Sequence, residues 1–325
     1  MRNAGAPSVS RQDVNLGVVM DPIGAIKPVK DSTLAMLLAA QRRGWKLWYM
    51  NLGDLWLDSG VAQGRMQELT VRDDLKDWYE IGAERTAGLA GLDIILMRKD
   101  PPFDMEYIYA TYILEIAAKD GVVVSNPPRA LRDINEKASI AWFPELSPPT
   151  LITRSMSQMR RFADTHKKVV FKPLDGMGGK SIFVISADDP NTNVVLETLT
   201  DYGRRFAMAQ GFIPEIAAGD KRILLVDGVA VPYSLARIPA KGENRGNLAA
   251  GARAVGQPLS ESDQRLAAEI GPAMVQRDLL FVGIDVIGEQ LTEINITSPT
   301  CIRELDAEFG LDIAGDYMAA LEKRL

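Results

Sequence analysis

The chain has very few of the side chains that most often carry covalent and metal-assisted chemistry. Among its 325 residues it has one cysteine, Cys301, and one histidine, His166. A single cysteine excludes an internal disulfide framework and indicates a reducing compartment. His166 lies in the polar run at residues 165–168, which predicts a surface position. The sequence therefore argues against zinc clusters and against catalysis built on histidine.

Long apolar runs and an excess of positive charge are also missing. No apolar stretch approaches the roughly 18 residues of a membrane-spanning helix, so we expect no membrane span. The 43 acidic residues outnumber the 37 basic ones, for a formal net charge of −6. This balance argues against nucleic acid as a partner, because binding a phosphate backbone needs a basic face. Residues 1–12 are small and polar without an apolar core, which argues against a signal peptide and predicts a disordered tail on a cytoplasmic protein.

What the sequence does contain is a glycine-rich stretch between two apolar runs, at residues 168–184. The first run breaks after Lys172, and three glycines, Gly176, Gly178 and Gly179, precede a second β-branched and aromatic run. Glycine permits positive φ and close backbone approach, so the bare N–H groups of such a loop can surround an anion. With Lys172 at its edge, the loop predicts a polyphosphate ligand.

Two common phosphate loops do not fit this stretch. Gly179 is followed by lysine and serine, as in a P-loop, but that motif needs a glycine where Leu174 stands. A dinucleotide fingerprint starting at Gly176 lacks its last glycine. Both motifs also need a following helix, whereas residues 182–185 are typical of a strand. The sequence predicts a hairpin that covers phosphates as a flap; an ordinary flexible hairpin is the alternative.

The first part of the chain alternates strands with helices. The elements are predicted at residues 16–20 (strand), 32–43 (helix), 46–52 (strand), 93–97 (strand), 106–119 (helix) and 122–124 (strand). Such alternation implies a parallel sheet, whose ligands lie beyond the carboxyl ends of the strands. Asp21 and Arg98 occupy that position, where they either line a site or lie on a solvated rim. Residues 58–90 are polar and predict no clear element.

A boundary at residues 126–128 precedes a smaller mixed unit. Its elements are predicted at residues 131–143 (helix), 150–153 (strand), 157–167 (helix), 168–184 (the glycine hairpin), 193–202 (helix) and 206–210 (strand).

The last part of the chain predicts longer strands. Two strands, at 220–226 and 229–237, flank Asp227-Gly228, a strong hairpin signal. Residues 239–258 are glycine-rich, lack periodicity and carry more basic than acidic residues. This composition predicts a flexible lid that covers an anionic ligand. The elements that follow are predicted at residues 261–277 (helix), 280–287 (strand) and 290–296 (strand), with helices to the end.

The last predicted hairpin carries an acidic pair. Glu293 and Asn295 are two residues apart on a strand and share a face. A two-residue turn would place Asp285 opposite Thr292, and a three-residue turn would place it opposite Glu293. Two carboxylates and an amide oxygen are hard ligands that suit magnesium bridging nucleotide phosphates. A solvated polar strand edge is the alternative.

Cys301 is the only candidate for a covalent intermediate, and nothing near it in the sequence resembles its base, so positioning and charge neutralisation are the expected chemistry.

Seven motifs lie in order along about residues 14–310, at residues 19–22, 96–104, 135–137, 171–179, 219–222, 246–251 and 292–300. In these motifs the chain resembles prokaryotic glutathione synthetases, which are ATP-grasp ligases.

The resemblance implies a role for each matching residue. Nucleotide contacts are implied for Lys137, Lys172, the flap glycines Gly176, Gly178 and Gly179, and Gln210, Gly211, Phe212, Ile213 and Asp220. Neutralisation of phosphate and acyl-phosphate charge is implied for Arg222 and Arg237, with Lys172 beside them. Metal binding is implied for Asp285, Glu293 and Asn295. The peptide site is implied at Asp21, Arg98, Ser298, Arg303 and Glu304.

The resemblance also implies an architecture and a reaction. The fold is expected to be α/β (α+β): an ATP-grasp fold with an N-terminal Rossmann-like parallel-sheet domain at 13–134. A small lid subdomain is expected at 135–213, and a C-terminal subdomain with the metal site and the flexible loop at 214–325. The family reaction joins γ-L-glutamyl-L-cysteine to glycine, using ATP as co-substrate and Mg²⁺ or Mn²⁺ as cofactor. A cytoplasmic homotetramer is expected.

Two other functions remain open at this level. Another ATP-grasp carboxylate–amine ligase would share every nucleotide residue and differ at the N-terminal rim and after Asn295. A non-catalytic ATP-binding module would be expected to lose metal ligands, whereas all three positions are filled here.

Overall fold

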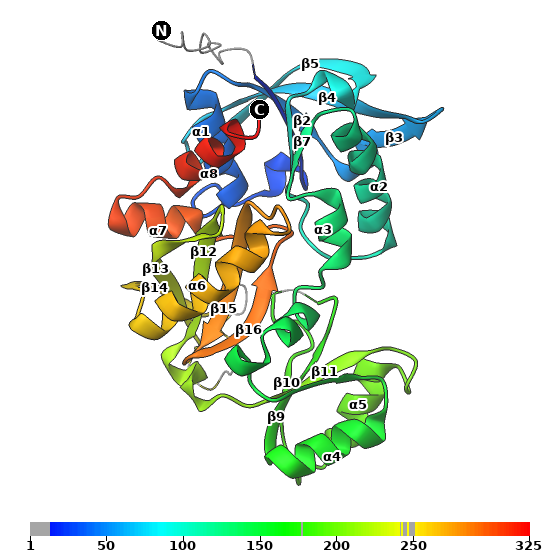
Figure 1. Ribbon diagram of the computed structural model, residues 1–325, viewed down its shortest axis with the longest axis vertical. Helices are drawn as coiled ribbons and strands as arrows, with labels where there is room; N and C mark the ends of the chain where they lie inside the picture. The colour runs from blue at the N-terminus through cyan, green and yellow to red at the C-terminus, as the bar shows by residue number, and fades with distance from the viewer. Residues whose placement is uncertain (1–13, 177, 241, 243–245, 247–250) are drawn as a thin grey trace, which may run out of the picture.

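Three β-sheets follow one another along the long axis of the molecule (Figure 1). The computed structural model describes residues 14–176, 178–240, 242, 246 and 251–325. The predicted disordered tail at residues 1–12 lies outside them, as do residues 241, 243–245 and 247–250 of the predicted loop. No helix of the described residues is long and apolar enough to cross a membrane.

The N-terminal sheet has a parallel core with an antiparallel extension. Its strands run in the order β3-β4-β2-β1-β6-β7, with β5 paired to β4, and β2, β1, β6 and β7 are parallel. They are β1 (Asn15–Val19), β2 (Lys46–Met50), β3 (Leu55–Asp58), β4 (Val61–Val71), β5 (Tyr79–Gly88), β6 (Ile94–Met97) and β7 (Val123–Ser125). The parallel strands are apolar because both of their faces are covered.

Helices cover this sheet on both sides. They are α1 (Ser32–Arg42), α2 (Met105–Lys119) and α3 (Pro128–Asp133). The carboxylate of Asp31 accepts the Leu34 N–H at 2.7 Å and caps α1. Residues 58–90, which predicted no clear element, form the end of β3 and the long antiparallel pair β4–β5. Burial in β4 alternates along much of the strand, so the strand signal was present although diluted by polar residues.

The predicted helix at residues 131–143 is wrong. The chain instead forms α3, a turn at residues 134–137 and a 3₁₀ helix at Ala138–Trp142. The helix stops because the side chain of Asn135 accepts the N–H groups of Lys137 and Ala138, at 3.1 and 2.9 Å, in competition with the helical ladder.

The small sheet at the bottom of Figure 1 is antiparallel, in the order β10-β9-β11-β8. Its elements are β8 (Thr150–Thr153), α4 (Met156–His166), β9 (Lys168–Pro173), β10 (Phe183–Ser186), α5 (Thr192–Thr200) and β11 (Ala207–Gly211). Phe183 pairs with Phe171 in the β9–β10 hairpin, which confirms the predicted strand–loop–strand arrangement. Both helices pack on one face of this sheet around a separate apolar cluster that includes Met159, Phe171 and Leu196.

The C-terminal sheet is also antiparallel, in the order β14-β13-β12-β15-β16. Its elements are β12 (Asp220–Val226), β13 (Val229–Ile238), β14 (Arg253–Pro258), α6 (Glu261–Val275), β15 (Phe281–Ile287), β16 (Gln290–Asn295), α7 (Ile302–Phe309) and α8 (Ile313–Glu322). The predicted β12–β13 hairpin across Asp227-Gly228 is confirmed. Residues 239–258 are not a loop throughout, because their last six residues form β14 and pair with β13.

Short 3₁₀ helices complete the chain. They lie at Ile23–Ala25, Leu52–Asp54, Leu89–Gly91, Pro144–Leu146 and Pro214–Ala218, in addition to Ala138–Trp142.

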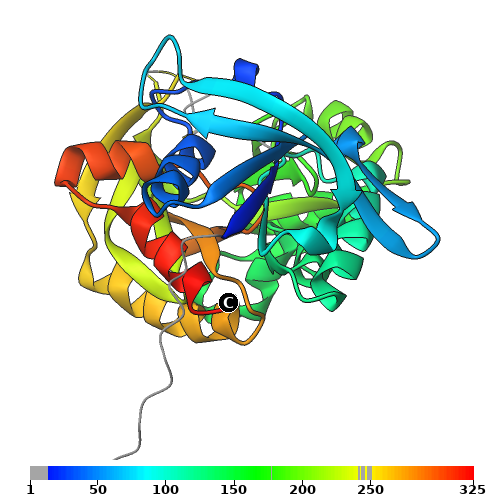
Figure 2. The ribbon, with the colours of Figure 1, turned by 90° about the horizontal axis from the view of Figure 1, so that it is seen from above.

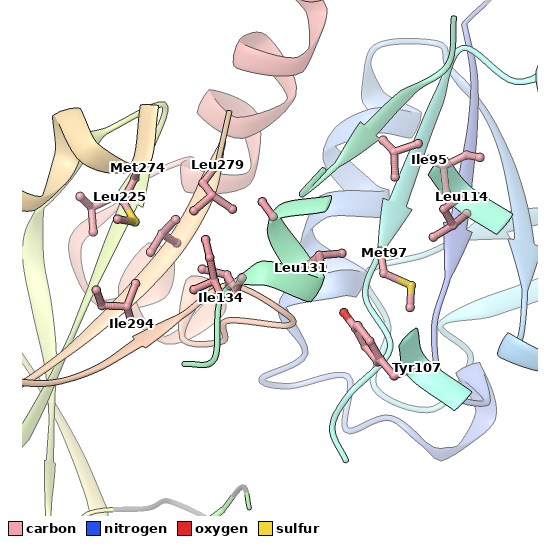
Figure 3. Packing of buried hydrophobic residues seen from close by; sticks show 14 of the residues in the cluster. Ile95, Met97, Tyr107, Leu114, Leu131, Ile134, Leu225, Met274, Leu279 and Ile294 are labelled. Atoms are coloured by element: carbon pink, nitrogen blue, oxygen red, sulfur yellow. The ribbon is translucent and has the colours of Figure 1, made fainter. Parts of the chain in front are cut away.

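The first and last parts of the chain share their apolar cores. Figure 2 shows α8 beside α1, and Nη2 of Arg43 donates to the carbonyl of Gly315 at 2.7 Å. Figure 3 shows Leu131 and Ile134 of the α3 region between residues of the N-terminal sheet and residues of the C-terminal sheet. Continuous packing of this kind fixes the two sheets relative to each other.

One buried side chain ties these sheets by hydrogen bonds. Asn126, directly after β7, donates from Nδ2 to the carbonyls of Phe281 and Ile296, both at 2.8 Å. Its Oδ1 accepts the N–H groups of Leu280 and Phe281, at 3.0 and 3.2 Å. The amide therefore uses its donors and its acceptor to hold the start of β15 beside the end of β16.

We expect Asn126→Ala to lower the free energy of unfolding by about 3 kcal/mol or more, because each buried group left unpaired costs about 1–3 kcal/mol. Urea unfolding measures the loss. Asn51→Ala, which removes the capping side chain of the 3₁₀ helix at Leu52–Asp54, is the control and should cost about 1 kcal/mol. Equal losses in the two variants would contradict the assigned role of Asn126.

Candidate active site

Two adjoining cavities lie between the sheets. The first is enclosed by the glycine hairpin, the end of β11 and the edge of the C-terminal sheet. The second lies between the loops that follow β1 and β6 and the segment after β16. The residues that line both cavities are Lys137, Gly176, Gly178, Asp285 and Glu293. The two cavities therefore meet at these residues, where a molecule in one would face a molecule in the other.

The first cavity has an apolar end and a charged end. Its apolar lining comes from Val170, Ile182, Val184, Ile213, Ile216 and Ile287, with Phe212 beside them. All ten residues predicted to contact nucleotide line this cavity: Lys137, Lys172, Gly176, Gly178, Gly179, Gln210, Gly211, Phe212, Ile213 and Asp220. Gly178 and Gly179 have φ of 63° and 78°, the left-handed conformation that glycine adopts without strain.

Two buried lysines share one carboxylate at the charged end. Lys137 and Lys172 are 6% and 5% exposed, and their Nζ atoms lie 3.6 and 3.8 Å from Oε1 of Glu293. Lys137 also donates to the carbonyl of Gly176 at 2.6 Å, which links it to the flap. Burial lowers the pKa of Lys172 from its ordinary value, and the charge of Glu293 opposes that shift. Two cations facing one anion leave positive charge for a phosphate.

Two buried arginines share a second carboxylate. Arg222 donates to both oxygens of Asp285, from Nε at 2.5 Å and Nη2 at 3.0 Å, and Nη2 of Arg237 lies 2.9 Å from Oδ2. Burial alone would raise the pKa of Asp285, but the two guanidinium groups more than offset it and hold the pKa below its usual range. Arg237 also donates to Asp220, whose pKa burial raises to about 6.

Asp285 faces Glu293 because β16 contains a bulge. The turn at Gly288-Glu289 has two residues, which would place Asp285 opposite Thr292 in a regular ladder. Instead the register shifts by one residue, so that Val286 pairs with Leu291 and Asp285 pairs with Glu293. The hydroxyl of the extra residue, Thr292, donates to the carbonyl of Asp285 at 3.1 Å. Both sequence alternatives were thus half right: the shorter turn forms, and the bulge gives the pairing expected of the longer one.

The predicted metal ligands Asp285, Glu293 and Asn295 all line the second cavity. Glu293 and Asn295 alternate along β16, and the Nδ2 atom of Asn295 is buried with no hydrogen-bond partner in the described residues. Carboxylate and amide oxygens beside a phosphate site are the donors that Mg²⁺ prefers, since it completes its shell with phosphate oxygens and water. Among the described residues no group of three His, Cys, Asp or Glu forms a metal cluster. The set fits a cation that is shared with a nucleotide.

The second cavity has a polar rim from the N-terminal sheet. Asp21 accepts the N–H of Asp100 at 3.0 Å and lies 2.9 Å from Nζ of Lys99, and Ser298 donates to Asp100 at 2.6 Å. Glu304 also lines this cavity, and burial raises its pKa. Its Oε2 atom is buried without a hydrogen-bond partner in the part of the chain that the structure describes.

Two predicted substrate residues lie elsewhere. Arg98 is buried outside both cavity linings, where it donates to Thr33 at 3.1 Å and to the carbonyl of Pro299 at 2.8 Å. Arg303 forms an ion pair with Asp73 at 2.5 Å. Sequence analysis missed Lys27 and Lys30, which line the second cavity. They follow β1 as Asp21 does, so the strand-end rule that selected Asp21 could have found them.

Comparison with known proteins identifies the family. A model of the N-terminal domain of prokaryotic glutathione synthetase matches residues 14–132, and a model of the ATP-grasp domain of the same enzyme matches residues 136–317. The chain belongs to the prokaryotic glutathione synthetase family. Family membership and the shared fold make it an ATP-dependent ligase that forms a C–N bond.

Individual relatives agree with this assignment. Glutathione synthetases of Shewanella oneidensis and Yersinia pestis are each 56% identical to this chain, over 312 and 313 residues. These alignments cover 96% of the chain and 99% and 98% of the relatives. The crystal structure of the D-cycloserine synthetase DcsG has a TM-score of 0.68 at 14% identity and covers 96% of this chain and 100% of that one. This likeness shows the shared ATP-grasp fold.

For a member of the glutathione synthetase family, Lys172→Ala should weaken ATP binding by about 1.5–3 kcal/mol, as expected for a lost hydrogen bond to a charged group. Titration calorimetry would then give a Kd raised roughly 10- to 150-fold. Lys46→Ala, at an exposed lysine outside both cavities, is the control. An unchanged Kd for Lys172→Ala would remove this residue from the nucleotide site.

Cys301 should be dispensable for chemistry. It lines the second cavity, but burial raises the pKa of its thiol, which disfavours the nucleophilic thiolate. We expect Cys301→Ser to keep activity within about tenfold, a change below about 1.4 kcal/mol. Steady-state kinetics with circular dichroism as a folding control measures this. A thousandfold loss in a folded variant would reveal a covalent step.

Proposed function

We propose that this chain joins γ-L-glutamyl-L-cysteine to glycine, consuming ATP and releasing glutathione, ADP and phosphate. The observation that carries the proposal is that the two cavities meet at buried side chains that form ion pairs with one another. One cavity has the apolar slot and lysines that suit a nucleotide, and the other has the mixed charges that suit a zwitterionic peptide. Both family-model matches support the same reaction.

The nucleotide occupies the first cavity in this proposal. Its base lies in the apolar slot beside residues 210–213, and Asp220, one of whose carboxylate oxygens is buried without a partner in the described residues, accepts a ribose hydroxyl. Lys137 and Lys172 bind the phosphates, and the flap glycines bring backbone N–H groups over them. Asp285, Glu293 and Asn295 would hold a magnesium ion, or manganese in its place, which supplies charge neutralisation to the phosphates when bound.

The peptide occupies the second cavity, with its cysteinyl carboxylate at the shared wall. That carboxylate attacks the terminal phosphorus of ATP, so a C–O–P linkage forms and the bond to ADP breaks. The glycine amine then attacks the acyl carbon, a C–N bond forms, phosphate leaves and the amine loses a proton. Arg222 and Arg237 stabilise the charge that develops at the acyl oxygens, because they are held rigidly by Asp285 and need no reorganisation.

Phosphate release and tripeptide formation test the reaction. With ATP and magnesium, we expect stoichiometric phosphate and glutathione only when γ-glutamylcysteine and glycine are both present. A screen of other acids and amines, including D-alanine, covers the remaining carboxylate–amine ligases. Preferred turnover of any other pair would overturn the substrate assignment while leaving the ligase class intact.

The peptide site has a candidate for its ammonium group. Glu304 is half-buried, and its buried Oε2 atom lacks a hydrogen-bond partner in the described structure, so a cation placed there would offset its desolvation. We propose that Glu304 accepts a hydrogen bond from the α-ammonium group of the γ-glutamyl residue. Asp21 and Ser298 line the same cavity.

Glu304→Gln should therefore raise KM for γ-glutamylcysteine about tenfold, because it replaces an ion pair with a neutral hydrogen bond. Glutaryl-cysteine, which lacks the amino group, should be a poor substrate for the unmodified chain and lose no further efficiency in the variant. Arg303→Gln, next to Glu304 but paired with Asp73, is the matched control. Equal losses with both substrates would contradict an ammonium contact.

Three further expectations belong to this proposal. The three sheets are proposed to mark the N-terminal, lid and C-terminal units at 13–134, 135–213 and 214–325. A cytoplasmic location and a homotetrameric assembly follow from the family resemblance. Gel filtration with light scattering measures the oligomeric state directly.

A further inference from the structure

The turn at residues 134–137 contacts three separate parts of the site. Asn135 donates from Nδ2 to the carbonyl of Leu174 at 3.1 Å, which holds the base of the glycine hairpin. Lys137 donates to Gly176 and faces Glu293, as described above. Between them, Glu136 points to the far end of β16, and it also lines the second cavity.

Glu136 holds this strand end with four hydrogen bonds. Its Oε1 atom accepts the N–H groups of Ile296 and Thr297, at 2.8 and 2.9 Å, and the hydroxyl of Thr297 at 2.9 Å. Its main-chain carbonyl accepts the N–H of Ile294 at 2.9 Å. Residue 295 therefore lies between two positions that are each bonded to the same glutamate.

The position of these bonds explains why they are needed. The pairing of β15 with β16 ends at Gly283 and Asn295, so Ile296 and Thr297 continue beyond the ladder. Buried N–H groups beyond a ladder need other acceptors. The carboxylate of Glu136 supplies them. The carbonyl of Ile296 is satisfied separately, by Nδ2 of Asn126. The chain that follows carries Ser298 and Thr300 into the second cavity.

We propose that Glu136 is a positioning residue that sets the peptide-binding segment and Asn295 in register with the phosphate lysine beside it. This inference rests on the proposed function, because it names the reaction whose geometry is set. Three donors already occupy Oε1, so its role is to orient the chain rather than to take a proton from substrate. Through one turn of chain, the flap base, Lys137 and the end of β16 are fixed relative to each other.

Steady-state kinetics on Glu136→Ala and Glu136→Gln tests the proposal. We expect Glu136→Ala to raise KM for γ-glutamylcysteine at least tenfold and to raise the ratio of phosphate released to glutathione formed. Calorimetric affinity for ADP, measured in EDTA, should change less than threefold, because the adenine end of the first cavity does not touch Glu136. Glu136→Gln keeps an acceptor for the backbone donors, so KM should return to within threefold of the original value.

Matched variants separate positioning from stability. Asp54→Ala removes another buried carboxylate, which lies outside both cavities and accepts the backbone N–H of Asn51 at 2.7 Å. It should lower Tm but leave KM and the phosphate ratio unchanged. Thr297→Val removes one of the three donors and should raise KM about two- to fivefold; it also keeps the test decisive if Glu136→Ala does not fold.

Two results would overturn the positioning role. The first is an unchanged KM and phosphate ratio in folded Glu136→Ala or, failing that, in Thr297→Val. The second is a Glu136→Gln variant as impaired as Glu136→Ala, which would assign the carboxylate charge to substrate contact. If the unmodified chain makes no glutathione, the proposed function fails. The KM and the phosphate ratio of the same variants are then measured with the acid and amine that the chain does join.

Discussion

The site depends on a cluster of buried charged side chains that form ion pairs with one another. Four cations, Lys137, Lys172, Arg222 and Arg237, face three carboxylates on the C-terminal sheet, Asp220, Asp285 and Glu293. An isolated buried charge costs several kcal/mol, so each of these groups constrains the position of the next. The remaining positive charge makes the cluster a receptor for an anion, and the burial of its side chains strengthens that attraction.

Each sheet contributes a different part of this cluster, which explains the architecture. The small sheet supplies Lys172 and the flap, the C-terminal sheet supplies the arginines and carboxylates, and the N-terminal sheet supplies the rim of the peptide cavity. The small sheet has an apolar cluster of its own, and it also contributes Met208 to a cluster that the other two sheets share. Packing thus fixes the rim of the second cavity relative to β15 and β16, while the flap lies on a sheet whose helices surround a core of their own.

Much of this could be predicted from the sequence, and the failures have physical causes. Periodicity and strand-end position located the parallel sheet and placed Asp21 at the site, because burial repeats along strands. The helix at 131–143 failed because one side chain, Asn135, competes with backbone hydrogen bonds, which periodicity does not record. Arg98 and Arg303 were predicted at the peptide site, but the groups that hold them, the carbonyl of Pro299 and the carboxylate of Asp73, come from distant parts of the chain. The position of Asp285 depended on a bulge that turn rules alone do not specify.

That bulge makes the site sensitive to the register of β16 rather than to its length. Thr292 is the added residue, and beyond it Glu293 and Asn295 face the cavity while Ile294 is fully buried. With Thr292 retained, an unbroken ladder would exchange the two faces of the strand beyond this point, sending the side chains of Glu293 and Asn295 into the core and that of Ile294 toward the cavity. Burying two polar side chains and exposing an apolar one is unfavourable, so the sequence of β16 itself holds the bulge in place. Loss of Thr292 alone would leave Glu293 opposite Asp285 in a regular ladder, so a one-residue gap at this position among natural or engineered descendants would keep the two carboxylates paired.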